Sequence, residues 1–203
     1  MSKIFLFDLG NVLAKSLDNN ELYRNLNCKI SYEEFEKYWF YDDIVINAHK
    51  GTVTDEYHIK KLLEYCKSNL TVEEFYKIYN KLDNSMYQDT IDLINMLKNK
   101  GFKVGILSNL RLMDYDRYKD QINLLDLDYQ FLSYEMGCIK PYKEIYEFVI
   151  KKCSCDPKNI VFFDDNINNV EGARKCGIDA YNVTGDNIKK VFGEMYDIIL
   201  INN

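Results

Sequence analysis

Short apolar runs recur along the chain, and segments with helical spacing of apolar residues separate them. The runs cover residues 4–7, 102–107, 129–133, 160–163 and 179–183. Apolar runs of this length are typical of strands that are buried on both faces. Strands that alternate with helices predict a parallel sheet with right-handed crossovers. We therefore expect an α/β fold, with a Rossmann-like parallel sheet flanked by helices.

Helical segments follow several of these runs and predict the flanking layers. The predicted helices cover residues 89–99, 142–152 and 168–176. Gly101 and Gly177 follow the first and the last of them, where the missing Cβ suits the end of a helix. The tail at residues 196–201 fits either a last strand or the end of a helix.

The segment at residues 15–85 has a different character. It is rich in Glu, Lys and Tyr, and its apolar residues follow helical spacing. Ser31 with Glu34, and Thr71 with Glu74, have the spacing of capping boxes that mark helix starts. We therefore predict a helical domain inserted after the first strand. The predicted division is a core of residues 1–14 and 86–203 and an inserted domain of residues 15–85.

Acidic residues stand at the ends of two predicted strands. Asp8 follows the first strand, and Asp164 and Asp165 follow the fourth. Open α/β sheets bind their ligands at the carboxyl ends of the strands. A carboxylate there can act as a nucleophile or as a metal ligand. Because adjacent carboxylates repel each other, a shared cation explains this set most simply, and Mg²⁺ prefers such oxygen ligands.

Three further residues complete the candidate site. Ser108 and Asn109 end the second predicted strand, where a hydroxyl and an amide could hold phosphate oxygens. Lys140 precedes Pro141, and a lysine near three carboxylates could balance charge and bind a transferring phosphoryl group. Each residue alone is unremarkable as a turn or surface residue, so the prediction depends on their joint order along the chain.

These residues, in this order, resemble the four motifs of the haloacid dehalogenase-like hydrolase superfamily, most of whose members are phosphatases. Asp8 matches the nucleophile of the first motif, Ser108 the second motif, Lys140 the third, and Asp164-Asp165 the fourth. A subgroup with Asp-x-Gly-Asn-Val as its first motif includes phosphatases that act on sugar phosphates such as glucose 1-phosphate. The resemblance spans nearly the whole chain and implies a Mg²⁺-dependent hydrolase of small phosphate monoesters.

The resemblance also assigns roles to the residues. It implies that Asp8 attacks phosphorus to form an aspartyl-phosphate, with Lys140 as a second catalytic residue. The implied metal ligands are Asp8, the Gly10 carbonyl and Asp165, with Asp164 as an outer or alternate ligand. The implied phosphate-binding residues are Ser108, Asn109 and Lys140. Asn169 is expected to support the loop of the fourth motif, and residues 15–85 to form a four-helix C1-type cap that closes over the substrate.

Gly10 departs from the pattern of most phosphatases of the superfamily. They carry a second Asp two residues after the nucleophile, and it protonates the leaving group and later activates water. Removing a positioned acid–base group typically costs about 10²–10⁴-fold in rate. Because the resembling subgroup shares this glycine, Gly10 does not exclude activity. It leaves the proton donor open, with an ordered water or an acidic leaving group as alternatives.

Two other functions remain open at this point. A 2-haloacid dehalogenase also lacks the second Asp and needs no metal, but Asp164 and Asp165 would repel an anionic haloacid unless a cation were present. The second alternative is a non-catalytic protein that binds a phosphorylated ligand, and the reason to consider it is Gly10.

Arg111, three residues after Ser108, could reach a substrate or form a surface salt bridge.

Composition narrows the class of protein. The chain has 203 residues and a net charge of −6, which argues against nucleic acid as a partner. It contains no apolar segment of membrane-spanning length and no signal-peptide pattern. The six cysteines fit reduced thiols. We therefore expect a cytoplasmic enzyme, monomeric or homodimeric, whose partner is a small phosphorylated metabolite.

Overall fold

The computed structural model describes residues 3–201, and the side chains of residues 3–195. Five parallel strands form one sheet in the order β3-β2-β1-β4-β5. The strands are β1 (Ile4–Phe7), β2 (Lys103–Ser108), β3 (Tyr129–Leu132), β4 (Ile160–Asp164) and β5 (Asp179–Asn182). The parallel sheet that the apolar runs predicted is confirmed, and each strand lies within one or two residues of its run.

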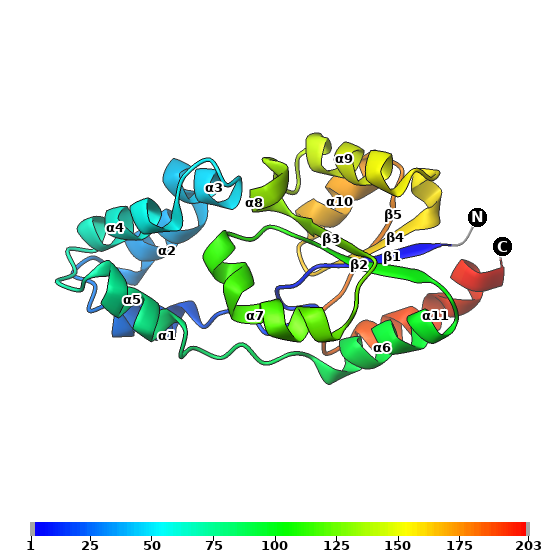
Figure 1. Ribbon diagram of the computed structural model, residues 1–203, viewed down its shortest axis with the longest axis horizontal. Helices are drawn as coiled ribbons and strands as arrows, with labels where there is room; N and C mark the ends of the chain where they lie inside the picture. Colours follow the sequence, from blue (N-terminus) through cyan, green and yellow to red (C-terminus); the bar gives the residue numbers. More distant parts are fainter. Residues whose placement is uncertain (1–2, 202–203) are drawn as a thin grey trace.

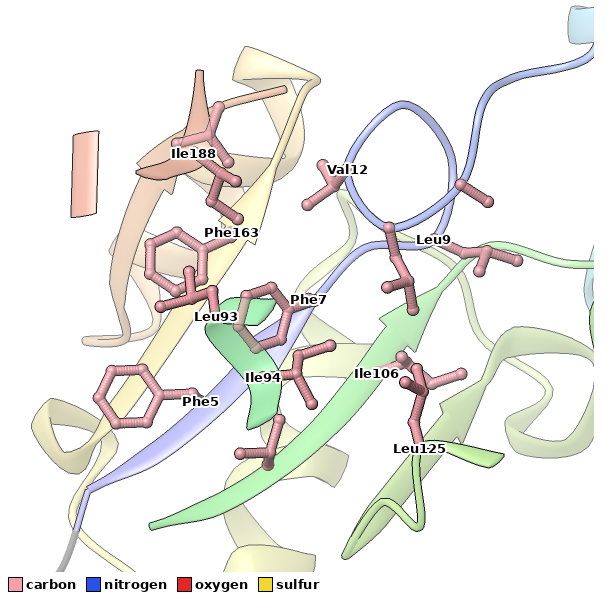
Figure 2. Packing of buried hydrophobic residues seen from close by; sticks show 14 of the residues in the cluster. Phe5, Phe7, Leu9, Val12, Leu93, Ile94, Ile106, Leu125, Phe163 and Ile188 are labelled. Atoms are coloured by element: carbon pink, nitrogen blue, oxygen red, sulfur yellow. The ribbon is translucent and has the colours of Figure 1, made fainter. Parts of the chain in front are cut away.

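Two helical layers cover the sheet (Figure 1). One layer contains α6 (Gln88–Asn99), α7 (Leu112–Leu124) and α11 (Ile188–Ile201), and the other contains α9 (Lys143–Cys153) and α10 (Ile167–Lys175). Successive side chains of a strand point to opposite faces. Phe5 and Phe7 of β1 therefore pack toward α6 and α11, whereas Ile4 and Leu6 pack toward α9 and α10. Figure 2 shows the first of these two cores, with the ring of Phe163 beside that of Phe7.

Five helices lie between β1 and α6 and gather at one end of the molecule (Figure 1). They are α1 (Asn19–Asn25), α2 (Tyr32–Tyr41), α3 (Asp43–His49), α4 (Asp55–Tyr65) and α5 (Val72–Tyr79). Both predicted capping boxes are present, at the starts of α2 and α5. The expected number of helices was four, and the difference arises because Asp42 ends α2 and caps α3. These helices share a hydrophobic core of their own.

Two extended segments connect this helical insertion to the sheet. Lys15 donates a backbone hydrogen bond to Ser85, and Tyr87 donates one to Leu13, at 2.9 Å each. Ala14 also forms an antiparallel bridge with Met86. The chain therefore leaves and re-enters the core along one narrow neck. The division into a core of residues 1–14 and 86–203 and a cap of residues 15–85 stays a prediction.

Helices α7 and the short α8 (Ser133–Met136) were not predicted, and α11 was predicted only as one of two alternatives for its end. The tail belongs to α11, so the helical alternative is the correct one for residues 196–201. Helix α7 was missed because five of its residues are charged and only Met113, Asp114, Tyr118 and Ile122 are buried. Among the described residues, no helix has the length and apolarity that a membrane crossing requires.

Candidate active site

The chain reverses its direction of travel across the sheet at β1, because β2 lies on one side of it and β4 on the other. Ligands of open α/β sheets bind at such a switch point, beyond the carboxyl ends of the strands. The register aligns Phe7 with Ile106 and Phe163. The polar residues that follow, on β1, β2 and β4, therefore meet at one edge of the sheet.

Asp8 and Lys140 form the centre of this site. Oδ1 of Asp8 accepts hydrogen bonds from the Leu9 amide at 2.7 Å and the Ser108 hydroxyl at 2.7 Å. It also lies 2.9 Å from Nζ of Lys140. Oδ2 of Asp8 has no hydrogen-bond donor in the described part of the chain. Three donors therefore fix the carboxylate and leave one oxygen available.

Lys140 is a buried cation between two carboxylates. Its Nζ lies 2.6 Å from Oδ2 of Asp164 and donates to the Leu107 carbonyl at 3.1 Å. Burial opposes its charge, but Asp164 and Asp8 outweigh burial and raise the pKa of Lys140. Burial raises the pKa of Asp8 to about 6, although Lys140 acts in the opposite direction. The lysine is therefore held in its charged form beside the predicted nucleophile.

Asp164 and Asp165 differ in what they contact. Asp164 is fully buried and accepts hydrogen bonds from Lys140, from the Asn166 amide and from the Asn169 side chain. The half-buried carboxylate of Asp165 accepts a hydrogen bond at Oδ2 from Nδ2 of Asn11, at 2.8 Å. Burial also raises the pKa of Asp165. Asp164 therefore orients Lys140, while Asp165 keeps an oxygen for another ligand.

The three carboxylates suit a hard cation. One oxygen each from Asp8, Asp164 and Asp165 can be chosen so that all lie within 4.8 Å of one another. Oxygen ligands of this kind, with a backbone carbonyl and substrate phosphate, match Mg²⁺. Gly10 lies on the loop after Asp8 and borders the adjoining cavity. The donor set therefore fits the predicted magnesium site.

The Asn109 side chain forms hydrogen bonds with the backbone of Lys140. Its Nδ2 donates to the Lys140 carbonyl at 2.9 Å, and its Oδ1 accepts from the Lys140 amide at 2.8 Å. Both polar atoms of the side chain are therefore paired with the backbone that carries Lys140. This pairing supports the position of the lysine, and contact of the Asn109 side chain with phosphate stays a prediction.

Two cavities adjoin the site. One of about 390 Å³ lies between the loop after β1 and the helical insertion, and Gly10, Asn11, Asp165 and Trp39 border it. One of about 870 Å³ lies on the side of Lys140, Asn169 and His49. Phe40 borders both and is 48% exposed. Both volumes lie within or near the range of roughly 300–1,000 Å³ found for small-molecule sites.

Arg111 is buried rather than part of a surface salt bridge. Its Nε and Nη2 donate to the two oxygens of Asp114 at 2.8 and 2.9 Å. Tyr79 of the insertion also donates to Asp114. The spacing to Ser108 indicated Arg111, whereas Tyr79 and Asp114 carried no sequence signal. Asn11 was missed as well, although it belongs to the first motif.

Comparison with known proteins settles the family. Residues 2–177 match the family model described as haloacid dehalogenase-like hydrolase. The chain belongs to this family. It is 25% identical over 191 residues to the D-ribitol-5-phosphate phosphatase of Bacteroides thetaiotaomicron, covering 89% of this chain and 91% of that protein.

Solved structures agree with this assignment. A family enzyme of Bacteroides thetaiotaomicron in complex with magnesium and inorganic phosphate is 26% identical, with a TM-score of 0.77, and the match covers 91% of this chain and 96% of that chain. The L-2-haloacid dehalogenase of Xanthobacter autotrophicus is 18% identical, with a TM-score of 0.64, over 90% of this chain and 78% of that chain. The second likeness shows a shared fold alone.

Proposed function

We propose that this protein is a phosphatase that hydrolyses small sugar or alditol phosphates, with Mg²⁺, through an aspartyl-phosphate on Asp8. The observation that carries the proposal is that Asp8, Ser108 and Lys140 meet the adjacent carboxylates of the fourth strand at one edge of the sheet. The similarity to a ribitol-5-phosphate phosphatase supports the substrate class.

The first step is attack of a free carboxylate oxygen of Asp8 on phosphorus. Ser108 and Lys140 hold the other oxygen, so the carboxylate does not need to reorient before it reacts. Lys140 stabilises the charge that develops on the phosphoryl oxygens. The bond between phosphorus and the ester oxygen breaks, and the leaving alkoxide takes a proton from water. A water molecule then attacks the aspartyl-phosphate, which releases inorganic phosphate and restores the Asp8 carboxylate.

Asp8, Asp165 and the Gly10 carbonyl would hold the metal, with Asp164 as an outer ligand. Bound Mg²⁺ would neutralise the carboxylates and the substrate phosphate so that two anions can approach. The separate contacts of the two acids support this division, because Lys140, Asn166 and Asn169 already occupy Asp164.

Phosphate release with and without Mg²⁺ tests the proposal. The panel should contain ribitol 5-phosphate, glucose 1-phosphate and phenyl phosphate, with Asp8→Asn as the matched control. We expect turnover by the wild type that chelation abolishes, and no turnover by Asp8→Asn although it remains folded. Metal-dependent turnover by Asp8→Asn would refute the mechanism, and release of chloride from 2-chloropropionate without Mg²⁺ would favour a dehalogenase.

A further inference from the structure

Arg111 lies on the loop after β2, three residues beyond Ser108 and beside the helical insertion. It is 4% exposed and borders the 390 Å³ cavity, together with Gly10 and Asp165 of the candidate site. One cavity therefore joins the site of phosphoryl transfer to a buried guanidinium group. A bound substrate that fills this cavity would contact both.

The guanidinium group is held in a fixed orientation. Asp114 pairs with Nε and Nη2, and Cζ lies 4.3 Å from the centre of the Trp39 ring. Nη1 is buried, and it has no hydrogen-bond partner among the described residues. Because a buried donor without a partner is costly, a group that enters the cavity and accepts this hydrogen bond gains binding free energy.

The remaining donor indicates which group would bind. Carboxylates and phosphates are usually held by two parallel N–H bonds from one guanidinium. Asp114 already occupies that pair on Arg111 and balances its charge. The two N–H groups of Nη1 remain, beside a charge that Asp114 already balances, and they suit an acceptor oxygen without a formal charge. A hydroxyl group meets this requirement better than a second anion.

We propose that Arg111 is a specificity-determining residue that donates a hydrogen bond from Nη1 to a substrate hydroxyl group remote from the phosphate. The inference rests on the proposed function, because it takes the phosphate to lie at Asp8. It assigns the substrate class as polyol or sugar monophosphates that are long enough to reach from Asp8 to Arg111. Monoesters without hydroxyl groups gain nothing from this contact.

Arg111→Lys tests the assignment, because lysine keeps a positive charge opposite Asp114 but lacks the Nη1 donor. We expect kcat/KM for ribitol 5-phosphate to fall by about 10- to 100-fold, the usual effect of losing a hydrogen bond to a charged group. For phenyl phosphate, kcat/KM should stay within about 3-fold. Arg174→Lys is the matched control, since the Arg174 side chain pairs with Glu171 and the Ala180 carbonyl and does not itself line either cavity.

Several results would overturn the assignment. An equal loss of kcat/KM for both substrates would show that Arg111 only supports the structure, and no loss for either substrate would show that it contacts no hydroxyl group. A greater loss for phosphoglycolate than for ribitol 5-phosphate would show that it binds a carboxylate. Thermal unfolding of each variant separates loss of stability from loss of selectivity.

Binding to Asp8→Asn gives the same test without turnover. We expect calorimetry to show that ribitol 5-phosphate binds Asp8→Asn, and that adding Arg111→Lys raises Kd by about 10-fold or more. An unchanged Kd would overturn the role of Arg111. Absence of wild-type turnover on the whole panel would refute the phosphatase proposal instead, while this binding measurement would still decide the role of Arg111.

Discussion

Nζ of Lys140 lies 2.6 Å from Oδ2 of Asp164, and the two residues are 3% and 0% exposed. A buried ion pair of this kind is strongly destabilised when one partner is removed, because an uncompensated charge stays in the interior. Asp164 is therefore needed for the position of the lysine, whereas its neighbour Asp165 has its carboxylate beside the cavity. The two adjacent acids should respond differently to the same substitution.

Asp164→Asn should destabilise the protein, and Asp165→Asn should not. We expect Asp164→Asn to lower the free energy of unfolding by about 3 kcal/mol without Mg²⁺. Asp165→Asn should leave this free energy unchanged or raise it, since it removes a negative charge from a cluster of three. Urea denaturation of the two variants and the wild type in a chelating buffer measures this difference.

The Mg²⁺ concentration needed for activity should depend more on Asp165 than on Asp164. Asp165→Asn should raise the Mg²⁺ concentration for half-maximal activity by about 10-fold or more, because even outer partners of metal ligands typically contribute that much to affinity. Equal destabilisation by the two substitutions, or an unchanged Mg²⁺ requirement in Asp165→Asn, would contradict the division of roles.

The strand ends were predictable because they combine two strong local signals. Ile4–Phe7 and Ile160–Asp164 contain apolar runs that form buried strands of a parallel sheet. Asp8 directly follows the first strand, and Asp164 ends the second. The order of the strands in the sheet was not predicted from the sequence. The different surroundings of Asp164 and Asp165 could not be predicted, because they depend on side chains from three separate segments.

The pair of Arg111 and Asp114 should make stability depend on pH. Burial alone would raise the pKa of Asp114, but Arg111 outweighs it and holds the pKa well below its ordinary value. A carboxyl whose pKa is depressed in the folded protein stabilises it above the unfolded pKa, about 3.9 for Asp. This stabilisation is lost as pH falls below that value.

Asp114→Asn removes this contribution and provides the measurement. The difference in unfolding free energy between wild type and variant should be constant from pH 7 to about 5 and then shrink by about 1.4 kcal/mol per pH unit below pH 4. Asp116→Asn is the control, because Asp116 pairs with Lys119 on the surface. A difference that stays constant down to pH 3 would show that Arg111 does not set the titration of Asp114.

Asp55 should stabilise the contact between the helical insertion and the core. Its Oδ2 accepts a hydrogen bond from the Met113 amide at 2.8 Å, and Met113 packs into the core of the insertion. Asp55→Ala should lower the free energy of unfolding by about 1 kcal/mol and speed hydrogen exchange at the start of α7. Thr54→Ala, which removes only the cap of α4, should leave exchange at Met113 unchanged. Equal exchange at Met113 in both variants would exclude this role of Asp55.

Contacts between the insertion and the core account for most of what sequence patterns missed. Ser133 donates to the His49 carbonyl at 2.7 Å, although the two residues are far apart in sequence. Trp39 belongs to the core of the insertion, and its ring also packs on the guanidinium group of Arg111. Helical spacing identifies which residues are buried and does not identify the surface on the other domain that covers them.

Gly10 provides the sharpest test of the chemistry, because the position can accept a side chain. A Cβ placed on Gly10 would meet only Ser16 Oγ, at 3.4 Å, within 4 Å. Gly10→Asp should therefore fold and place a carboxyl group at the edge of the 390 Å³ cavity. Such a group can protonate a leaving alkoxide, and general acid catalysis typically contributes about 10²–10⁴-fold.

The gain should depend on the leaving group. For ribitol 5-phosphate, whose alcohol is a weak acid, we expect Gly10→Asp to raise kcat by about 10-fold or more. For para-nitrophenyl phosphate, whose leaving group needs no proton, kcat should change little. Gly10→Asn is the control, since it has the same size and no acid. An equal effect of Asp and Asn on both esters would show that the wild-type enzyme already has an efficient proton donor, and would direct the search to the other residues that border this cavity.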